Sequence, residues 1–260
     1  MSAAPVRIDH VVLVVTSLAD AVPAFAAAGF TVTPGGRHDT IPTENALVCF
    51  ADGSYLELLA AREPSTRDEL RALRAGGGWE RHLKGVSAVA RRFLPHLAGP
   101  DGVADWVLRG EALERRAAAL RTLGIKAAGP LAMGRERADG VKLEWRLLLP
   151  EARLHPFWIA DRTPRELRVP GDARATTHAN GASGIAAVRV CTPAVALQAL
   201  ALGEALGAIP RQRADVTVLE LEAGRVEVVE GEPEGACGAV IAGCGPLPPV
   251  VTALGVTAER

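Results

Sequence analysis

Two short apolar segments, each with one ionisable residue near its centre, constrain the fold of this chain most strongly. Residues 8–15 read IDHVVLVV and contain His10, and residues 54–59 read SYLELL and contain Glu57. Alternate side chains of an extended strand share a face, so the pattern places Ile8 on the same face as His10. A buried histidine or carboxylate is costly unless it is paired. The two segments therefore predict that His10 and Glu57 meet a metal ion or a polar ligand in a cupped sheet.

The residues between these segments predict one complete structural unit. Residues 18–28 favour a helix that Gly29 ends, and residues 30–33 and 45–50 are typical of strands. The order is βαβββ. The same order is expected over residues 103–162, where a strand at 104–108 precedes a helix at 111–123.

The first unit resembles a module of the vicinal oxygen chelate superfamily, the glyoxalase, bleomycin-resistance and extradiol-dioxygenase group. The resemblance is carried by IDHVVLVV with His10, by the AGF turn at residues 28–30, and by YLELL with Glu57. Further segments, among them RHDTIPTENALVCF and ADWVLRGEALE, resemble the glyoxalase-like branch of that superfamily. The resemblance implies an α+β fold, in which repeated βαβββ modules form a cupped mixed sheet with helices on the outer face. It also implies that the first and last strands of each module supply metal ligands.

The expected organisation follows from the repeat. Residues 1–170 are expected to hold the paired modules, 6–61 and 103–162, joined by a charged and glycine-rich connector at 62–102 with one helix at 65–75. Residues 171–260 are expected to form a third, incomplete module.

Composition narrows the classes of partner and compartment. The net charge is −1 with both signs interspersed, which argues against nucleic acid and anionic membranes as partners. No segment reads as a signal peptide or a membrane span, so a cytoplasmic protein is expected. The four cysteines show no metal-binding spacing, and Cys191 reads as a small core residue.

A metal site is the first interpretation of the cup. His10 and Glu57 are the expected ligands of one divalent ion (Zn, Fe, Mn or Ni), and Glu57 is also the candidate catalytic base. Alignment of the two modules places Trp106 opposite His10, and Phe157 or Trp158 opposite Glu57. The second module therefore lacks the expected ligand pair, and His38 and His155 are the candidates to complete the site.

An aromatic pocket is the second interpretation. Trp106, Phe157 and Trp158 are expected to line the cup and to stack on a planar or hydrophobic molecule. Trp145 is expected to face the helices instead, because its alternating neighbours are apolar. Other predicted ligand-binding residues are His38, Asn45 and Arg137, which flank the expected rim.

Two functions from different classes follow from these interpretations. One is a protein that binds a small organic molecule in the cup. The alternative is a metal-dependent lyase, isomerase or dioxygenase that acts on a vicinal-oxygen substrate through His10 and Glu57. A homodimer that docks through the third module is a further alternative.

Overall fold

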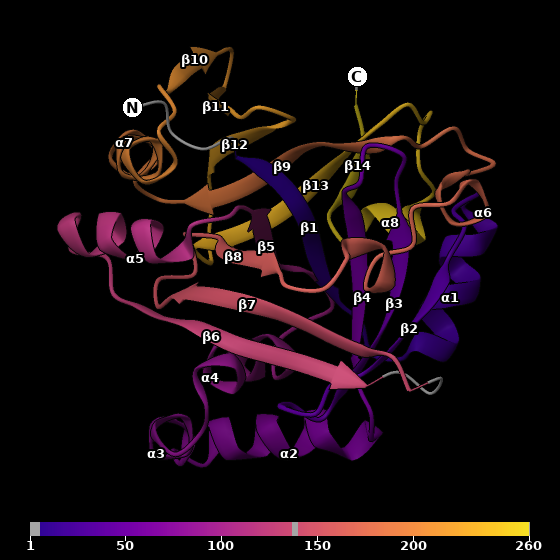
Figure 1. The fold of residues 1–260 in the computed structure, drawn as a ribbon, viewed down its shortest axis with the longest axis horizontal. Helices are drawn as coiled ribbons and strands as arrows, with labels where there is room; N and C mark the ends of the chain where they lie inside the picture. The colour runs from indigo at the N-terminus through magenta and orange to yellow at the C-terminus, as the bar shows by residue number, and fades with distance from the viewer. Residues whose placement is uncertain (1–5, 137–139, 260) are drawn as a thin grey trace.

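Strand β1 (Arg7–Val14) lies at the centre of an eight-stranded sheet and joins its two halves. In the computed structural model, the strand order of this sheet is β2-β3-β4-β1-β5-β8-β7-β6 (Figure 1). β1 pairs in parallel with the last strand of module one and antiparallel with the first strand of module two. The structure describes residues 6–136 and 140–259.

Each half of this sheet is one βαβββ module. Module one continues after β1 with α1 (Leu18–Ala27), β2 (Thr33–Arg37), β3 (Thr43–Cys49) and β4 (Tyr55–Ala61). Module two consists of β5 (Gly102–Arg109), α5 (Leu113–Thr122), β6 (Ala127–Glu136), β7 (Lys142–Pro150) and β8 (Phe157–Asp161). The sheet curls into a cup, and α1 and α5 lie on its outer side (Figure 1). The predicted α+β class with repeated βαβββ modules is confirmed.

The connector between the modules is more structured than its composition predicts. The sequence predicted one helix in residues 62–102, whereas the structure has α2 (Pro64–Ala75), α3 (Trp79–Lys84) and α4 (Ala88–Leu97). The glycines at 76–78 and 85 separate short helices here rather than mark an irregular linker. Helix α4 closes one side of the cup with Val89 and Phe93.

A buried ion pair holds α4 against the sheet. Arg92 donates from Nε and Nη2 to both carboxylate oxygens of Asp105, at 2.6 and 2.7 Å. The same guanidinium donates to the carbonyls of Pro150 and His155. Both charged side chains are almost fully buried, and a bidentate arginine pair of this kind satisfies them where water cannot.

The third module is complete, contrary to the sequence prediction. A second sheet has the order β10-β11-β12-β9-β13-β14, and its first four strands repeat the order of module one. The elements are β9 (Gly184–Thr192), α7 (Val195–Leu206), β10 (Arg211–Arg213), β11 (Val216–Glu220), β12 (Arg225–Glu230), β13 (Gly235–Ala242), α8 (Pro249–Thr252) and β14 (Val256–Ala258). β13 pairs with β9 and β14 pairs with β13, as β5 pairs with β1 and β8 pairs with β5 in the first sheet. The short strand β10, with polar residues only, explains why the repeat is difficult to recognise from sequence.

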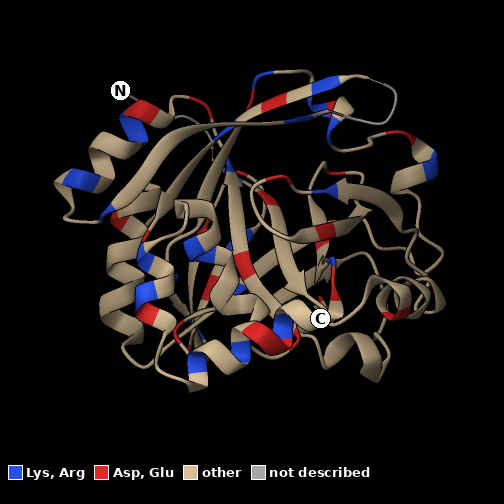
Figure 2. Cartoon of the chain, turned by 90° about the horizontal axis from the view of Figure 1, so that it is seen from below, with Lys and Arg blue, Asp and Glu red and all other residues tan. Residues whose placement is uncertain are grey.

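Two apolar clusters lie on opposite faces of the first sheet. The larger one fills the space between the sheets and includes Val11, Leu56, Trp106 and Val188. The smaller one lies inside the cup and includes Phe157. Among the described residues, no helix is long and apolar enough to cross a membrane. Figure 2 shows basic and acidic residues interspersed along the helices and loops.

The apolar surroundings of Cys191 in the sequence predicted a small core residue, but the structure shows a disulfide. The sulfur of Cys191 is bonded to that of Cys237, and the disulfide links β9 to β13. The antiparallel pairing of these strands shifts register between Ala236 and Gly238, so Cys237 is an extra residue in a β-bulge. A bulge cannot be read from spacing alone, and the sequence separation of 46 residues hides the pairing.

We predict that Arg92→Leu lowers the free energy of unfolding by about 3–5 kcal/mol, because it leaves the buried carboxylate of Asp105 without a counter-ion. The measurement is urea unfolding at neutral pH. The neighbouring Arg91→Leu is the matched control, because Arg91 is exposed on the same helix, and it should cost about 1 kcal/mol or less. Equal losses in the two variants would contradict the assignment.

Candidate functional site

A β-bulge at the start of β1 brings two adjacent polar side chains together. Ile8 pairs with Leu108 and His10 pairs with Val107, so Asp9 is an extra residue in the strand. A bulge re-aims side chains, and Nδ1 of His10 lies 2.8 Å from Oδ1 of Asp9. Strict alternation predicted that Ile8 shares a face with His10. That prediction is wrong, because the extra residue moves Ile8 into the cluster between the sheets.

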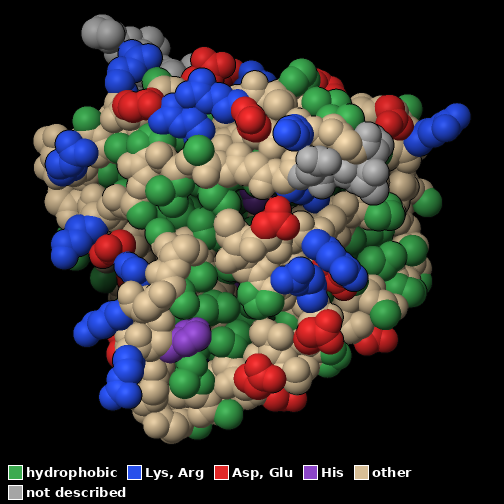
Figure 3. Space-filling view, turned by 60° about the horizontal axis from the view of Figure 1, so that its bottom comes forward, with side chains coloured by type: hydrophobic (Ala, Val, Ile, Leu, Met, Phe, Trp, Pro, Cys, Tyr) green, Lys and Arg blue, Asp and Glu red, His purple; other side chains and the backbone are tan. Residues whose placement is uncertain are grey.

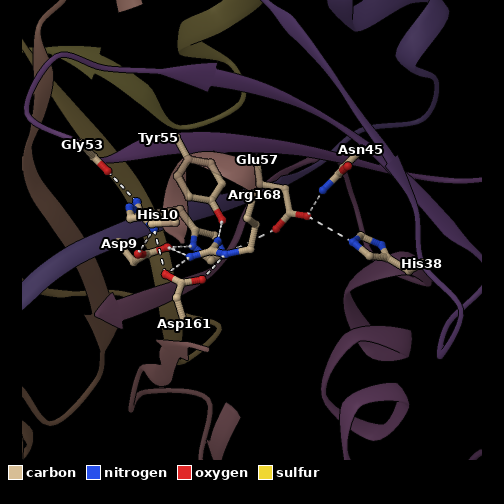
Figure 4. A network of polar contacts seen from close by, with 10 residues as sticks. Asp9, His10, His38, Asn45, Gly53, Tyr55, Glu57, Asp161 and Arg168 are labelled. Atoms are coloured by element: carbon tan, nitrogen blue, oxygen red, sulfur yellow. Dashed lines mark hydrogen bonds and ion pairs between the residues drawn. The ribbon is translucent and has the colours of Figure 1, made fainter. Parts of the chain in front are cut away.

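Glu57 lies between two histidines at the floor of the cup (Figure 4). Its Oε2 is 3.5 Å from Nε2 of His10, and its Oε1 is 3.7 Å from Nε2 of His38. The amide of Asn45 donates to Oε1 at 2.6 Å, and its own oxygen accepts from the backbone N–H of Gly36. Two strands of module one and the loop after β2 therefore direct polar groups to one carboxylate.

A second group of charges surrounds Asp9 (Figure 4). Arg165 donates to its Oδ2 at 2.7 Å, and Nη2 of Arg168 lies 3.6 Å from its Oδ1. Arg168 also forms a bidentate pair with Asp161 and donates to the hydroxyl of Tyr55. The two arginines come from η1 (Arg165–Leu167) and the residue that follows it, just before α6 (Ala173–Thr176). This segment thus neutralises a buried carboxylate that also pairs with His10.

These contacts shift the ionisation of the floor. Burial alone would raise the pKa of Glu57, but the contact with His10, together with His38 and Asn45, lowers it to about 2. Burial would lower the pKa of His10, but the carboxylates of Asp9 and Glu57 raise it above its ordinary value. Burial does lower the pKa of His38. Arg168, His10 and Arg165 overcome the burial of Asp9 and hold its pKa well below the usual range.

The walls of the cup are mainly apolar. The cavity has a volume of about 110 Å³. Its lining includes the polar floor and rim side chains His10, Arg37, His38, Asp39, Thr40, Asn45, Tyr55, Glu57, Arg135 and Arg168, and the apolar side chains Ile41, Leu47, Leu59, Val89, Phe93, Met133, Trp145, Leu147, Phe157 and Ile159. Trp145 therefore lines the cup, and the prediction that it faces the helices is wrong. Its alternating neighbour Leu147 packs on the inner face as well.

Two of the predicted aromatic wall residues lie on the other face of the sheet. Trp106 is fully buried between the sheets and donates from Nε1 to the carbonyl of Leu154 at 3.2 Å. Trp158 is buried in the same cluster, and the guanidinium of Arg116 covers its ring at 3.7 Å. The prediction that Trp106 and Trp158 line the cup is wrong, whereas Phe157 does lie there.

The strand register explains the error. In module one, His10 pairs with Tyr55, and Glu57 follows two residues later. In module two, Val107 pairs with Phe157, and Ile159 follows two residues later. Val107 and Ile159 therefore occupy the positions of His10 and Glu57. The sequence alignment had placed Trp106 at the first position and Phe157 or Trp158 at the second. The second module supplies apolar groups at both places.

Two of the remaining predicted site residues lie at the floor of the cup. His38 and Asn45 contact Glu57, as described above. His155 is buried near α4 and does not line the cavity. Arg137 lies outside the described residues.

The floor offers two imidazoles and one carboxylate, which are donor types that divalent ions accept. The arrangement of these side chains fits an ion less well. His10 and His38 each have Nδ1 engaged, by Asp9 and by the hydroxyl of Thr43, and each directs Nε2 to Glu57. Such outer partners are usual for metal-bound histidines. However, in the described part of the chain no group of three or more histidine, cysteine, aspartate or glutamate side chains is arranged to hold a metal ion. The two histidines each contact Glu57 instead.

The second sheet has a different floor at the equivalent positions. In the parallel pairing of β9 with β12, Ala187 takes the place of His10 and Glu227 the place of Glu57. Glu227 is buried and pairs with Arg189 and Arg225 at 2.8 Å. Arginines therefore neutralise this floor.

Sequence reasoning missed Asp9, Arg165 and Arg168. A charged residue inside an apolar strand was the available signal for Asp9, since it stands next to His10. The arginines fall in a segment rich in proline and glycine that reads as a hinge. The spacing of Arg165 and Arg168, three residues apart, was the available signal for a shared structural role.

Comparisons with known proteins agree with this architecture. A hypothetical protein from Staphylococcus aureus superposes with a TM-score of 0.69 at 17% identity, over 92% of this chain and 91% of that chain. A mutant of 4-hydroxymandelate synthase from Streptomyces coelicolor superposes with a TM-score of 0.56 at 12% identity, over 92% and 71%. A xylose isomerase-like TIM barrel/4-hydroxyphenylpyruvate dioxygenase fusion protein gives 0.54 at 12% identity, over 93% and 37%. At these identities the likeness concerns the fold.

The sequence itself identifies the family. No curated protein matches the chain. The model of the glyoxalase-like domain matches residues 8–206, which include both modules of the cup and the first strand and helix of the third module. The chain therefore belongs to the glyoxalase-like domain family.

Proposed function

We propose that this protein binds a small amphipathic organic molecule in the cup of its first sheet. The observation that carries the proposal is the division of the cavity into a polar floor, formed by His10, His38 and Glu57, and apolar walls that include Trp145 and Phe157. Ligand sites commonly combine apolar walls with a few polar groups that fix orientation. The floor selects the polar end of the ligand, and the walls hold the remainder.

The floor favours a hydroxyl group on the ligand. Glu57 is held ionised, so it accepts hydrogen bonds, and the raised pKa of His10 favours its protonated form, which donates. A hydroxyl group can donate to the first and accept from the second. Two neighbouring hydroxyls can also engage the amide of Asn45 or the ring of His38. A vicinal diol is therefore the simplest probe of this floor.

Glu57 is better suited to binding than to proton abstraction in this arrangement. A general base works best when its pKa lies near the operating pH. With a pKa of about 2, the carboxylate of Glu57 is a weak base at neutral pH. This argues for a binding role of the residue that the sequence suggested as catalytic.

A divalent metal is the second candidate, and one observation favours it. Asp9 and Thr43 hold the Nδ1 atoms of His10 and His38, which leaves both Nε2 atoms facing Glu57. Two imidazoles and one carboxylate are a donor set that Zn²⁺, Fe²⁺ and Mn²⁺ accept. A bound ion would supply Lewis-acid polarisation of ligand oxygens. His10, His38 and Glu57 would hold it.

We predict that Glu57→Gln weakens the binding of 1,2-hexanediol about ten- to a hundredfold, because a hydrogen bond to a charged acceptor is lost. Binding is followed by the fluorescence of Trp145, which lines the cavity. Glu44→Gln is the matched control, since Glu44 lies on β3 outside the cavity lining. Trp145→Phe should remove the signal and Trp158→Phe should keep it. No signal change in the wild type with any diol would refute the proposal.

The pH dependence of stability in the metal-free protein tests the pairing of His10. Its folded pKa is raised above 6.5, so its contribution is complete below pH 6.5 and disappears as the pH rises through the folded value. The contribution of Glu57 is present above pH 4.5 and is lost as the pH falls towards 2. We expect urea unfolding to show a decline in stability above pH 6.5 that His10→Gln removes. His38→Gln should keep the decline, because the pKa of His38 is lowered.

For the metal candidate, calorimetric titration of purified protein with Mn²⁺ or Zn²⁺ is expected to give one site. Thr43→Val should weaken it about 10–100-fold, because the hydroxyl that orients His38 is lost while the side-chain shape is kept. His38→Ala should weaken it further. An absence of binding heat, or an affinity unchanged in both variants, rejects the metal candidate and leaves the first proposal intact.

A further inference from the structure

A second hollow lies next to the cup, in the helical segment between the two modules. It is bordered by α2, by α4 and by the loop that precedes β3, and its volume is about 650 Å³. Leu70, Leu73, Ala90 and Leu94 form its apolar floor. The polar side chains of Thr40, Thr66, Glu69, His82 and Ser87 also line it. Figure 3 shows hydrophobic side chains gathered in hollows on this side of the molecule. We call this hollow the helical groove.

The helical groove adjoins the cup. Thr40 lines both spaces, and the next residue, Ile41, lines the cup while Pro42 lines the groove. On α4, Val89 lines the cup and its neighbour Ala90 lines the groove. A single layer of side chains on one loop and one helix therefore separates the two spaces. Such a layer can part by rotamer changes without any movement of the sheet.

The size of the cup gives the reason to connect the two spaces. Pockets for organic ligands commonly measure about 300–1,000 Å³, whereas the cup measures about 110 Å³. The cup alone therefore holds a polar head and little more. The adjoining groove adds several times that volume and is apolar on its floor.

We infer that the ligand of the cup carries an alkyl or acyl tail, and that this tail passes beside Thr40 and Ile41 into the helical groove. The inference rests on the proposed function and names the substrate class of the same site: a hydroxylated head on a hydrocarbon chain. A hydrocarbon tail is the favoured occupant because the groove floor is apolar and because only one layer of side chains separates the groove from the site for the polar head. The α2–α4 segment then determines which chain lengths are accepted.

The test is the affinity of a series of 1,2-alkanediols from butanediol to dodecanediol, measured by the fluorescence of Trp145. Each methylene that enters the groove should tighten binding roughly fourfold. The gain should continue past the length that fills the cup. Thr66→Trp and Val86→Trp each fill the groove with an indole. Ser65→Trp and Lys84→Trp are the matched controls, because these neighbours are exposed and do not line it.

Three outcomes decide the matter. The inference is supported if affinity rises with the length of the diol in the wild type and if both groove variants abolish this rise. Both control variants should keep the rise, and the binding of butanediol should be the same in all of them. Binding that is equally tight for short and long diols in the wild type overturns the inference and leaves the proposed function standing. No binding of any diol overturns both.

A competing occupant is tested in the same samples. If sedimentation shows a dimer that Thr66→Trp converts to monomer, a second copy of the chain fills the groove and the inference is wrong. A sedimentation coefficient that is the same in the wild type, the groove variants and the controls removes this competitor and supports the tail.

Discussion

The burial of Asp9 is the constraint on which the site depends. A carboxylate inside a sheet is tolerated only when charged partners replace water. Here the partners are His10 in the same bulge and two arginines from the segment after β8. The bulge, the orientation of His10 and the path of the chain after module two are therefore one arrangement. Tyr55 completes it, because its ring stacks on His10 at 4.4 Å while its hydroxyl accepts from Arg168.

The helical insertion gives the cup its shape. Arg92 ties α4 to β5, and Arg67 ties α2 to the carbonyls of Leu97 and Gly99 and to Asp101. These buried guanidinium contacts fix the helices at the side of an otherwise open sheet. A cup built from strands alone would be wider and wetter. The insertion makes the site narrow, and it adds an apolar surface that the paired modules do not supply.

Much of the fold, and less of the site, can be predicted from the sequence. Strand alternation and glycine-terminated helices predict both modules, because these patterns are local. The faces of Glu57 and Leu56 follow correctly from alternation in β4, which has no bulge. Alternation does not predict the faces of Ile8 and Trp106. The bulge at Asp9 changes the first, and the offset between the two modules changes the second, and both depend on pairing between strands. Arg165 and Arg168 act over more than 150 residues of chain, which no local pattern reports.

The neutralised floor of the second sheet has an evolutionary consequence. Modules one and three share the same βαβββ order. Module one has His10 and Glu57 at the floor, and module three has Ala187 and Glu227, which pairs with arginine. The backbone order is the same in both, so the fold does not require the polar pair. Descendants of this chain can therefore exchange the floor residues of the cup with little loss of foldability. In such a lineage, ligand preference should diverge faster than the apolar positions that hold the sheets together.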